Sequence, residues 1–439
     1  MTPDTLAIIG AGPSGLAAAR NLDRQGLSWV GFELANGVGG LWDIDGPRST
    51  MYESAHLISS RTTTEFSEFP MGEDIADYPS HRELKRYFDA FADHFDLRDR
   101  FRFGTEVVRL EPAGDGAWDV TSRSPAGKQT ERFGGVILAN GTLSEPNMPS
   151  FEGDFAGTVM HTSEYRSGRQ LTDQRVLIIG AGNSGCDIAV DAVHHAASID
   201  LSVRRGYHFV PKYLFGKPAD TLNQGRPLPA RIKQAVDKRV LRLFTGDPVR
   251  LGFPEPDHKI YESHPIVNSL ILHHLGHGDL QVRADVERFD GHTVRFRDGT
   301  ADDYDLVILA TGYRLHYPFI DPVHLQWDTP DSGESRTAAP DLYLNIFTQR
   351  HPTLFMLGML EASGIGWQGR YEQADLVARY LAAKRDAPDR ASSLECAIAG
   401  PRPDLSGGYH YLGIDRMAYY VNKDAYRALV RRSIEELTA

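Results

Sequence analysis

The chain has 439 residues, a net charge of −12 and 41% hydrophobic residues. This length allows two or three domains, and the acidic balance argues against nucleic acid or an anionic membrane as a partner, because phosphate groups need a basic surface. The two cysteines, Cys186 and Cys396, are too few for a disulfide framework or a zinc site. No apolar run approaches the roughly 18 residues of a membrane span, and a strand pattern beginning at Leu6 leaves no room for an export signal. We therefore expect a cytoplasmic protein without an integral membrane span.

A glycine turn follows the first apolar strand pattern, 6–9, and opens an alanine-rich helix. In this context G-x-G-x-x-G predicts a dinucleotide site, because the glycines let the backbone approach a pyrophosphate and the helix start attracts the anion. The second strand ends at Glu33, about 20 residues on, where an acid bonds the ribose 2′-hydroxyl. The turn and this acid predict an FAD site whose contact residues are Gly10, Gly12, Pro13, Ser14, Gly15 and Glu33.

A second glycine turn repeats the first, since residues 178–185 match residues 8–15 at seven of eight positions. Its following strand pattern, 199–203, ends in Arg204-Arg205 and not in an acid. A guanidinium fork matches a ribose 2′-phosphate, which a carboxylate would repel, so this turn predicts NADPH. The alternative for the two arginines is a solvated pair at a strand end. The predicted NADPH contacts are Gly180, Gly182, Asn183, Ser184, Gly185, Arg204 and Arg205.

Two buried strand patterns, 133–141 and 304–312, bracket the second turn, and each closes on a small residue and a glycine. This is expected where the chain returns to a sheet beneath a bound cofactor. The fold class is therefore α/β, with two Rossmann-like, three-layer (ββα) dinucleotide domains, the NADPH domain nested within the FAD domain. The expected boundaries are 1–165 for the first part of the FAD domain, 166–305 for the NADPH domain, and 306–439 for the rest of the FAD domain with a C-terminal extension.

An insert at about 206–265 exceeds what a nucleotide domain needs, and we expect it to contact substrate or form a lid. Residues 232–244 within it have helical spacing and a basic polar face. A core-packed surface helix is the commoner interpretation of this pattern, and a membrane-facing helix is the rarer one.

The stretch 155–165, Phe-Ala-Gly-Thr-Val-Met-His-Thr-Ser-Glu-Tyr, resembles the F-x-G-x-x-x-H-x-x-x-Y fingerprint of the flavin-containing monooxygenases. Further similar stretches are 39–42, 66–71, 77–81 and 310–313. The resemblance implies an FAD- and NADPH-dependent monooxygenase that forms a C4a-(hydro)peroxyflavin and passes one oxygen atom of O₂ to a small molecule. Tyr165-Arg166 stands where the related Baeyer-Villiger enzymes carry tryptophan followed by Pro or Asp, which favours oxidation of a nucleophilic nitrogen or sulfur.

The resemblance also implies site residues. Gly40, Leu41 and Trp42 are expected beside the flavin, and His161 is the fingerprint histidine, with a structural role or one coupled to NADPH. The catalytic candidates are Ser59, His161 and Trp42, the further cofactor contacts are Val107, Thr311, Gly312 and Gln368, and no metal site is expected.

The chain departs from the family at Ile58, where members usually carry an asparagine that is thought to bond the oxygenated flavin. Isoleucine cannot donate a hydrogen bond. Either His56, Ser59 or Ser60 replaces the asparagine, or oxygen transfer is less efficient. Three alternatives stay open: oxygenation of a carbonyl substrate as in Baeyer-Villiger enzymes, an NADPH oxidase or flavin reductase, and a flavoprotein that binds both dinucleotides without turnover. A homodimer is also left open.

Overall fold

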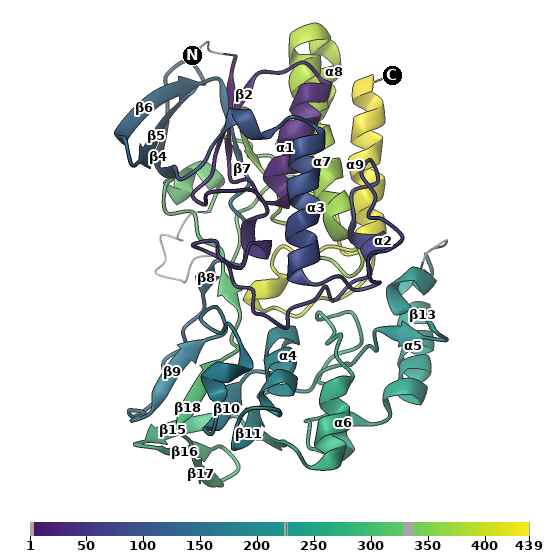
Figure 1. Ribbon diagram of the computed structural model, residues 1–439. Helices are drawn as coiled ribbons and strands as arrows, with labels where there is room; N and C mark the ends of the chain where they lie inside the picture. The colour runs from purple at the N-terminus through teal and green to yellow at the C-terminus, as the bar shows by residue number, and fades with distance from the viewer. Residues whose placement is uncertain (1–3, 224, 226, 328–337, 439) are drawn as a thin grey trace, which may run out of the picture.

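The computed structural model describes residues 4–223, 225, 227–327 and 338–438. Parts of the expected insert and of the expected domain 306–439 therefore lie outside the described residues. The chain forms two lobes, one above the other in Figure 1, and each lobe is built on a five-stranded sheet.

The sheet of the first lobe is parallel throughout and has the strand order β20-β7-β1-β2-β3. Its strands are β1 (Leu6–Ile9), β2 (Trp29–Phe32), β3 (Phe101–Arg102), β7 (Gly135–Leu138) and β20 (Leu354–Met356). Side chains alternate along a strand, so Ile8 faces the helical layer and Ile9 faces an antiparallel meander. Because both faces of the sheet are covered, every residue of β1 and β7 is buried.

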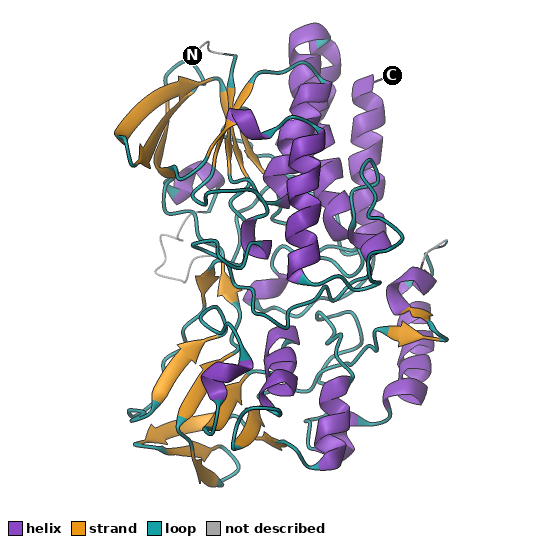
Figure 2. Ribbon diagram, in the orientation of Figure 1, coloured by secondary structure: helices purple, strands orange, loops and turns teal. Residues whose placement is uncertain are grey.

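Helices cover one face of this sheet and the meander covers the other (Figure 2). The helices are α1 (Pro13–Arg24), α3 (His81–His94), α7 (Gly366–Asp386), α8 (Pro388–Ala399) and α9 (Lys423–Thr438), and the meander is β4 (Glu106–Pro112), β5 (Trp118–Ser124) and β6 (Gly127–Phe133).

The second lobe repeats this arrangement, with a parallel sheet in the order β14-β11-β10-β18-β9. Its strands are β9 (Thr158–His161), β10 (Arg175–Ile179), β11 (Ser198–Ser202), β14 (Gln281–Arg283) and β18 (Leu306–Leu309). Helices α4 (Asn183–Ala192) and α6 (Leu270–His277) cover one face, and the meander β15 (Val286–Asp290), β16 (Thr293–Phe296) and β17 (Ala301–Asp303) covers the other. Two Rossmann-like units, one nested in the other, were predicted, and this prediction is confirmed.

The nested unit differs in extent from the expected range 166–305. Both β9 and β18 pair within the second sheet, with Leu306 beside Thr158 and Val176. A short, fully buried strand pattern such as that of β18 does not reveal which sheet it joins, and here β20 completes the first sheet instead. We propose boundaries near 158 and 309 for the nested unit.

The chain crosses between the lobes twice, and the two crossings lie side by side. Strand β8 (Glu145–Pro146) pairs antiparallel with β19 (Tyr313–Arg314), so that Tyr313 lies opposite Pro146. The Thr311 hydroxyl donates to the Asn147 carbonyl at 2.6 Å, and the Asn147 N–H donates to the Gly312 carbonyl at 2.9 Å. The lobes are thus joined by a two-stranded ribbon.

The insert stands at the side of the second lobe (Figure 1) and contains the hairpin β12 (Tyr213–Leu214) and β13 (Lys217–Pro218), followed by α5 (Ala230–Thr245). It has a small core of its own around Leu214, Leu241 and Ile260. The remaining short elements are α2 (Arg61–Thr64) and the 3-10 segments Gly40–Trp42, Arg98–Arg100, Gly168–Leu171, Ala219–Asn223, Pro248–Leu251, Pro322–Leu325 and Asp415–Met417. Within the described ranges, no helix combines the length and apolar content of a membrane crossing.

Candidate active site

The first glycine turn is folded tightly between the ends of β1 and β7. Gly10 has a φ of 107°, and a Cβ built on it would lie 2.6 Å from the Ala139 carbonyl oxygen. A Cβ on Gly15 would lie only 1.8 Å from the Gly10 carbonyl oxygen. Gly12 is the N-cap of α1 and supplies no side-chain cap, so the first N–H groups of the helix are left for an anion. Ser14 packs beneath the turn against Gly358.

The second turn has the same geometry. Gly180 has a φ of 108°, a Cβ on it would lie 2.6 Å from the Ala310 carbonyl oxygen, and a Cβ on Gly185 would lie 2.1 Å from the Gly180 carbonyl oxygen. Gly182 is the uncapped N-cap of α4 and has open space where a Cβ would stand. The backbone of Ala139 therefore contacts the first turn as that of Ala310 contacts the second. This equivalence explains why Ala-x-Gly recurs at 139–141 and 310–312. It also places Thr311 and Gly312 beside the second turn, at the crossing between the lobes.

Acidic and basic groups follow the two turns as the sequence predicts. The Gly10 N–H donates to the Phe32 carbonyl, which holds Glu33 against the first turn, where its carboxylate accepts the Ala11 N–H at 2.6 Å and the Ala35 N–H at 2.8 Å. Burial raises the pKa of Glu33, and these backbone hydrogen bonds oppose the rise. Such a carboxylate fits the hydroxyl donors of an unphosphorylated ribose.

At the second turn, the Gly180 N–H donates to the Ser202 carbonyl at 3.0 Å, two residues before Arg204. Arg204 is exposed, while the Arg205 Nε is covered and has no hydrogen-bond partner among the described residues. A guanidinium with an unpartnered Nε at this edge fits a 2′-phosphate. The residues present therefore fit FAD at the first turn and NADPH at the second.

The segment 40–42 lies directly over the first turn. The Gly39 N–H donates to the Ala11 carbonyl at 3.0 Å, and a Cβ on Gly40 would lie 3.0 Å from the Gly12 Cα. The partly buried Leu41 holds the segment through its carbonyl, which accepts the Ser49 hydroxyl at 2.6 Å. The helix α7 begins beside this segment, because the Trp42 ring meets the Trp367 ring edge-on with centroids 5.8 Å apart.

Two other expected cofactor contacts have their side chains occupied. The Gln368 side-chain oxygen accepts the Ser67 N–H at 2.9 Å, which fixes the start of α7 to the 66–69 turn. Val107 is buried between the first sheet and its meander, where its side chain offers no polar group to a cofactor. Contacts of these two residues with FAD stay predictions.

The hydroxyl of Ser59 is directed to a neighbour. It lies 2.7 Å from the Thr64 hydroxyl, and Thr64 donates its own hydrogen to the Ser60 carbonyl at 2.8 Å. The Ser59 hydrogen therefore points to Thr64, which leaves Ser59 only as an acceptor. The other substitutes for an asparagine at Ile58 are also engaged, because His56 Nδ1 lies 2.8 Å from the Ser54 carbonyl and the Ser60 hydroxyl lies 3.2 Å from the Thr63 hydroxyl. Thr63 donates its own hydrogen to Asp220 of the insert at 2.6 Å, so the Ser60 hydrogen is directed to Thr63.

His161 supports the crossing between the lobes. The Ser163 N–H donates to Nδ1 at 3.1 Å, so the ring hydrogen lies on Nε2, which donates to the Gly312 carbonyl at 3.0 Å. Burial lowers the pKa of His161, which keeps the ring neutral. Because both ring nitrogens form hydrogen bonds with backbone groups, the geometry of His161 suits positioning of the backbone at the crossing.

A polar network between the lobes escaped prediction, because its members are more than 100 residues apart and form no motif. The Tyr52 hydroxyl donates to Asp187 at 3.3 Å, the Ser54 hydroxyl donates to Asp191 at 3.0 Å, and Lys212 donates to the Leu57 carbonyl at 3.2 Å. Burial raises the pKa of Asp187 and lowers that of Lys212. These contacts hold the segment after 40–42 against α4 and against the insert.

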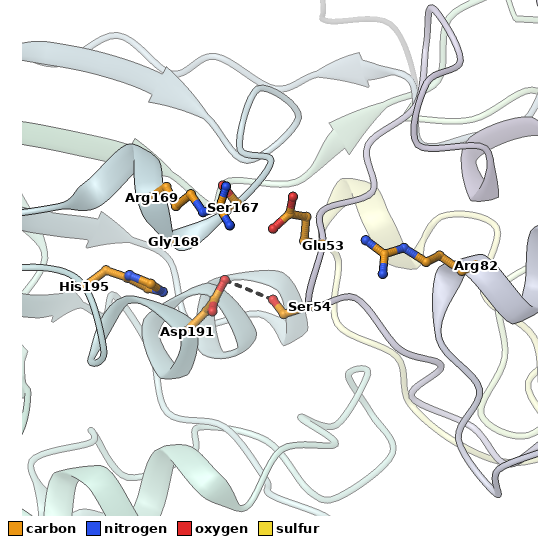
Figure 3. Close-up of a pocket in the computed structure, with 8 residues that line it drawn as sticks. All are labelled: Glu53, Ser54, Arg82, Ser167, Gly168, Arg169, Asp191 and His195. Atoms are coloured by element: carbon orange, nitrogen blue, oxygen red, sulfur yellow. Dashed lines mark hydrogen bonds between the residues drawn. The ribbon is translucent and has the colours of Figure 1, made fainter.

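A polar pocket of about 380 Å³ has walls from both lobes, and the hydrogen bond between Ser54 and Asp191 forms one of its sides (Figure 3). Glu53 and Arg82 come from the first lobe, and Arg169, Asp191 and His195 come from the second. Asp191 lies eight residues beyond Asn183, about 12 Å along the helix at 1.5 Å per residue. The pocket is thus separate from the second glycine turn and marks the boundary between the lobes.

The single difference between the two turns, Pro13 against Asn183, has a structural role. Asn183 binds a segment that ends the insert: its side-chain oxygen accepts the Val267 N–H at 2.7 Å, and its amide donates to the Pro265 carbonyl at 3.4 Å. The preceding His264 places Nδ1 3.2 Å from the hydroxyl of Tyr420 in the C-terminal extension, while its Nε2 is covered and has no hydrogen-bond partner within the described part of the chain. The second turn is thus connected through His264 to the C-terminal extension.

We predict that His264 makes the fold sensitive to acid. Burial, helped by Arg416, lowers the pKa of His264 to about 3, whereas an unfolded histidine titrates near ~6.5. Below pH ~6.5 the unfolded chain binds a proton that the folded chain does not. The free energy of unfolding therefore decreases as the pH is lowered, by up to about 1.4 kcal/mol per pH unit. Urea unfolding between pH 7 and 4 should show a shallower decline for His264→Gln than for the wild type. His277→Gln, at a side chain 67% exposed, is the control, and parallel slopes for His264→Gln and wild type would contradict the prediction.

Three potential metal ligands gather at the end of α6. The ligand atoms of His274, His277 and Asp279 all lie within 4.8 Å of one another. In the structure His274 Nδ1 lies 2.8 Å from the Asp279 carboxylate, the geometry of an ion pair at a helix end. The cluster lies apart from both glycine turns.

Comparison with known proteins points to one family. Residues 4–399 match the family described as flavin-binding monooxygenase-like. The chain is 30% identical over 388 residues to flavin-containing monooxygenase 5 of Homo sapiens, covering 83% of this chain and 70% of that protein. Among solved structures, S-allyl-L-cysteine S-oxygenase from Allium sativum is similar with a TM-score of 0.66 at 21% identity, covering 98% of this chain and 88% of that one. Cyclohexanone monooxygenase from Rhodococcus sp. Phi1 bound to NADP⁺ is similar with a TM-score of 0.71 at 20% identity, covering 99% and 98%.

Proposed function

Because the chain belongs to the flavin-binding monooxygenase-like family, we propose that it is an FAD- and NADPH-dependent monooxygenase that transfers one oxygen atom of O₂ to a nucleophilic nitrogen or sulfur of a small molecule. The observation that carries this proposal is the pair of equivalent glycine turns, one followed by Glu33 and the other by Arg204 and Arg205. A cytoplasmic location and a homodimer stay predictions from the sequence.

The chain's own groups would bind and orient two dinucleotides. The free N–H groups at the start of α1 suit the FAD pyrophosphate, and Glu33 suits its ribose. The start of α4 suits the NADPH pyrophosphate, and Arg204 with Arg205 suits its 2′-phosphate. When bound, FAD supplies the redox chemistry, accepting hydride from NADPH and activating O₂.

Other residues would shape the space around the reacting atoms. Gly40 lets the backbone approach the first turn, and the paired rings of Trp42 and Trp367 exclude water beside it. His161 holds the Gly312 carbonyl at the crossing, so we assign it a positioning role and not proton transfer. The Ser59 hydroxyl would accept a hydrogen bond and not donate one, because its own hydrogen is directed to Thr64.

The preference for nitrogen or sulfur rests on Tyr165 and Arg166. Arg166 donates to the carbonyl oxygens of Ser163 at 2.7 Å and Ser49 at 3.1 Å, and Tyr165 donates to Asp191. Neither Pro nor Asp, the residues of Baeyer-Villiger relatives at this position, could make the contacts of Arg166. Oxygenation of a carbonyl carbon is the alternative reaction.

Rapid-mixing spectroscopy tests the proposal. NADPH should bleach the yellow enzyme without oxygen, and aerobic turnover with an amine or a thioether should give oxygenated product in proportion to NADPH consumed. Hydrogen peroxide in place of product with every amine, thioether and ketone tried would indicate an NADPH oxidase. Product from ketones alone would indicate the Baeyer-Villiger reaction, and no bleaching by NADPH would leave a binding protein.

Ile58 gives a further prediction about efficiency. Ile58→Asn introduces an amide donor beside Ser59, Ser60 and His56, whose own donors are engaged. One added hydrogen bond is worth about 1 kcal/mol, so we expect about fivefold less hydrogen peroxide per NADPH during amine oxidation. Ile58→Val, which adds no donor, is the control. An equal fall in both variants, or no fall in either, would contradict the explanation.

A further inference from the structure

The exposed large hydrophobic side chains of the described residues are concentrated in the insert. Nine of these twelve lie between positions 213 and 249, while the described residues elsewhere contribute Met148, Val159 and Leu270. Scattered single apolar residues are ordinary on a protein surface, but a concentration in one element indicates a contact surface.

Helix α5 has two opposite apolar faces. Ala230, Gln234 and Leu241 are buried and turn toward the remainder of the insert. On the other side, Ile232, Val236 and Leu243 are 53%, 43% and 84% exposed. Their spacing of four and seven residues places them in one stripe along a helix of 3.6 residues per turn. A surface helix in water needs only the first face, so the second requires another explanation.

The neighbouring hairpin adds exposed aromatic rings beside this stripe. Phe215 stands at the tip between β12 and β13, is 77% exposed, and has its ring centroid 5.1 Å from that of Phe244 on α5. Its φ of 52° is left-handed, a conformation that two-residue turns usually assign to Asn or Gly. A bulky aromatic side chain there is both strained and exposed to water, and strain of this kind accompanies functional surfaces.

The charge of α5 opposes that of the whole chain. Residues 230–245 contain five basic residues and one acid, a net charge of +4, within a chain of net charge −12. Exposed Arg239 lies inside the apolar stripe, because it follows Ile232 by seven residues, which is about two turns of the helix. The acidic balance that argues against an anionic partner therefore does not describe this surface.

We propose that this surface, the α5 face formed by Phe215, Ile232, Val236, Arg239, Leu243 and Phe244, lies in the plane of an anionic lipid membrane. An apolar stripe bordered by cations is the pattern of helices that bind at the lipid headgroup level without crossing the bilayer. A symmetric pair of α5 faces would bring together two helices of charge +4, which disfavours a second copy as the partner. Nucleic acid would satisfy the cations but leave Leu243 and Phe215 in water.

Vesicle co-sedimentation of the purified, FAD-loaded chain tests this proposal. We expect binding to phosphatidylcholine vesicles containing phosphatidylglycerol, little binding to phosphatidylcholine alone, and loss of binding at high salt. Leu243→Ser should weaken binding at least about tenfold, since it removes the most exposed apolar side chain. Arg239→Glu changes the charge by two, and at about fivefold per charge should weaken it by about 25-fold.

Matched variants elsewhere separate this face from general effects. Val159→Ser removes an exposed apolar side chain from β9, and Lys128→Glu makes the same charge change on β6. Both should bind vesicles as the wild type does, and retained flavin absorbance should show that every variant is folded. The proposal is overturned if anionic vesicles are not bound, or if Leu243→Ser and Val159→Ser bind equally. It is also overturned if Leu243→Ser converts a dimer to a monomer in light scattering without lipid, because the face would then be a protein interface.

Discussion

Gly15→Ala is expected to yield a protein that purifies without FAD, while Gly185→Ala keeps FAD but is no longer reduced by NADPH. A Cβ at Gly15 would lie 1.8 Å from the Gly10 carbonyl oxygen, and a Cβ at Gly185 would lie 2.1 Å from the Gly180 carbonyl oxygen. Both neighbours are backbone atoms within the turn itself, so neither clash is relieved by a side-chain rotation. Each turn must open to accommodate the methyl group. The N–H groups at the start of its helix then no longer point toward the pyrophosphate.

Flavin absorbance per protein measures the first effect, and we expect less than about a tenth of the wild-type content for Gly15→Ala, a loss of more than about 1.4 kcal/mol of FAD affinity. The rate of anaerobic bleaching by NADPH measures the second effect in Gly185→Ala. Gly114→Ala, where a Cβ meets nothing within 4 Å, is the control for glycine replacement. Normal FAD content in Gly15→Ala, or simultaneous loss of both functions in Gly185→Ala, would refute the assignment of one cofactor to each turn.

The second large effect is expected from the arginine pair. Replacing Arg204 and Arg205 together by glutamate removes two charge-assisted hydrogen bonds to the 2′-phosphate and adds repulsion. Each such bond contributes about 1.5 to 3 kcal/mol, so the KM for NADPH should rise at least about 100-fold. The KM for NADH, which has no 2′-phosphate, should change little, and FAD content should be unaffected.

A control for this experiment is Arg295→Glu on β16, an exposed arginine in the same lobe that is paired with Asp290. It should leave both KM values unchanged. An unaltered preference for NADPH over NADH in the double variant would show that the specificity lies elsewhere. A fall in FAD content would show instead that the variant perturbs the fold beyond the second turn.

The sequence was sufficient for the parts of the fold that depend on local geometry. The turns at Gly10 and Gly180 were predictable because a strand, a glycine spacing and a helix start together allow one conformation. The position of Glu33 followed from the length of one βα unit. The buried strand β18 was different, since its four apolar residues suit either sheet, and only its pairing with β9 and β10 decides between them.

The remaining features depend on pairs of distant residues or on orientation. The contact of Tyr52 with Asp187 joins positions 135 residues apart, and neither residue belongs to a motif. The hydrogen of Ser59 is assigned only once Thr64 is seen to donate to Ser60. For α5, periodicity showed a helix with a basic side, but only the exposures of Ile232 and Leu243 show that a second apolar side has no cover.

The β8–β19 ribbon restricts how the two halves of the molecule can move. Two unpaired connections would let one lobe slide relative to the other. Here the antiparallel pairing of Pro146 with Tyr313 joins both connections into one ribbon. Asn147 forms hydrogen bonds with Thr311 and Gly312 at the edge of this ribbon. A two-stranded ribbon of this kind bends and twists about a single hinge line, and it resists translation of one lobe relative to the other. Any swing of one lobe relative to the other would therefore follow one arc about the ribbon, beside which Gly312 and His161 lie.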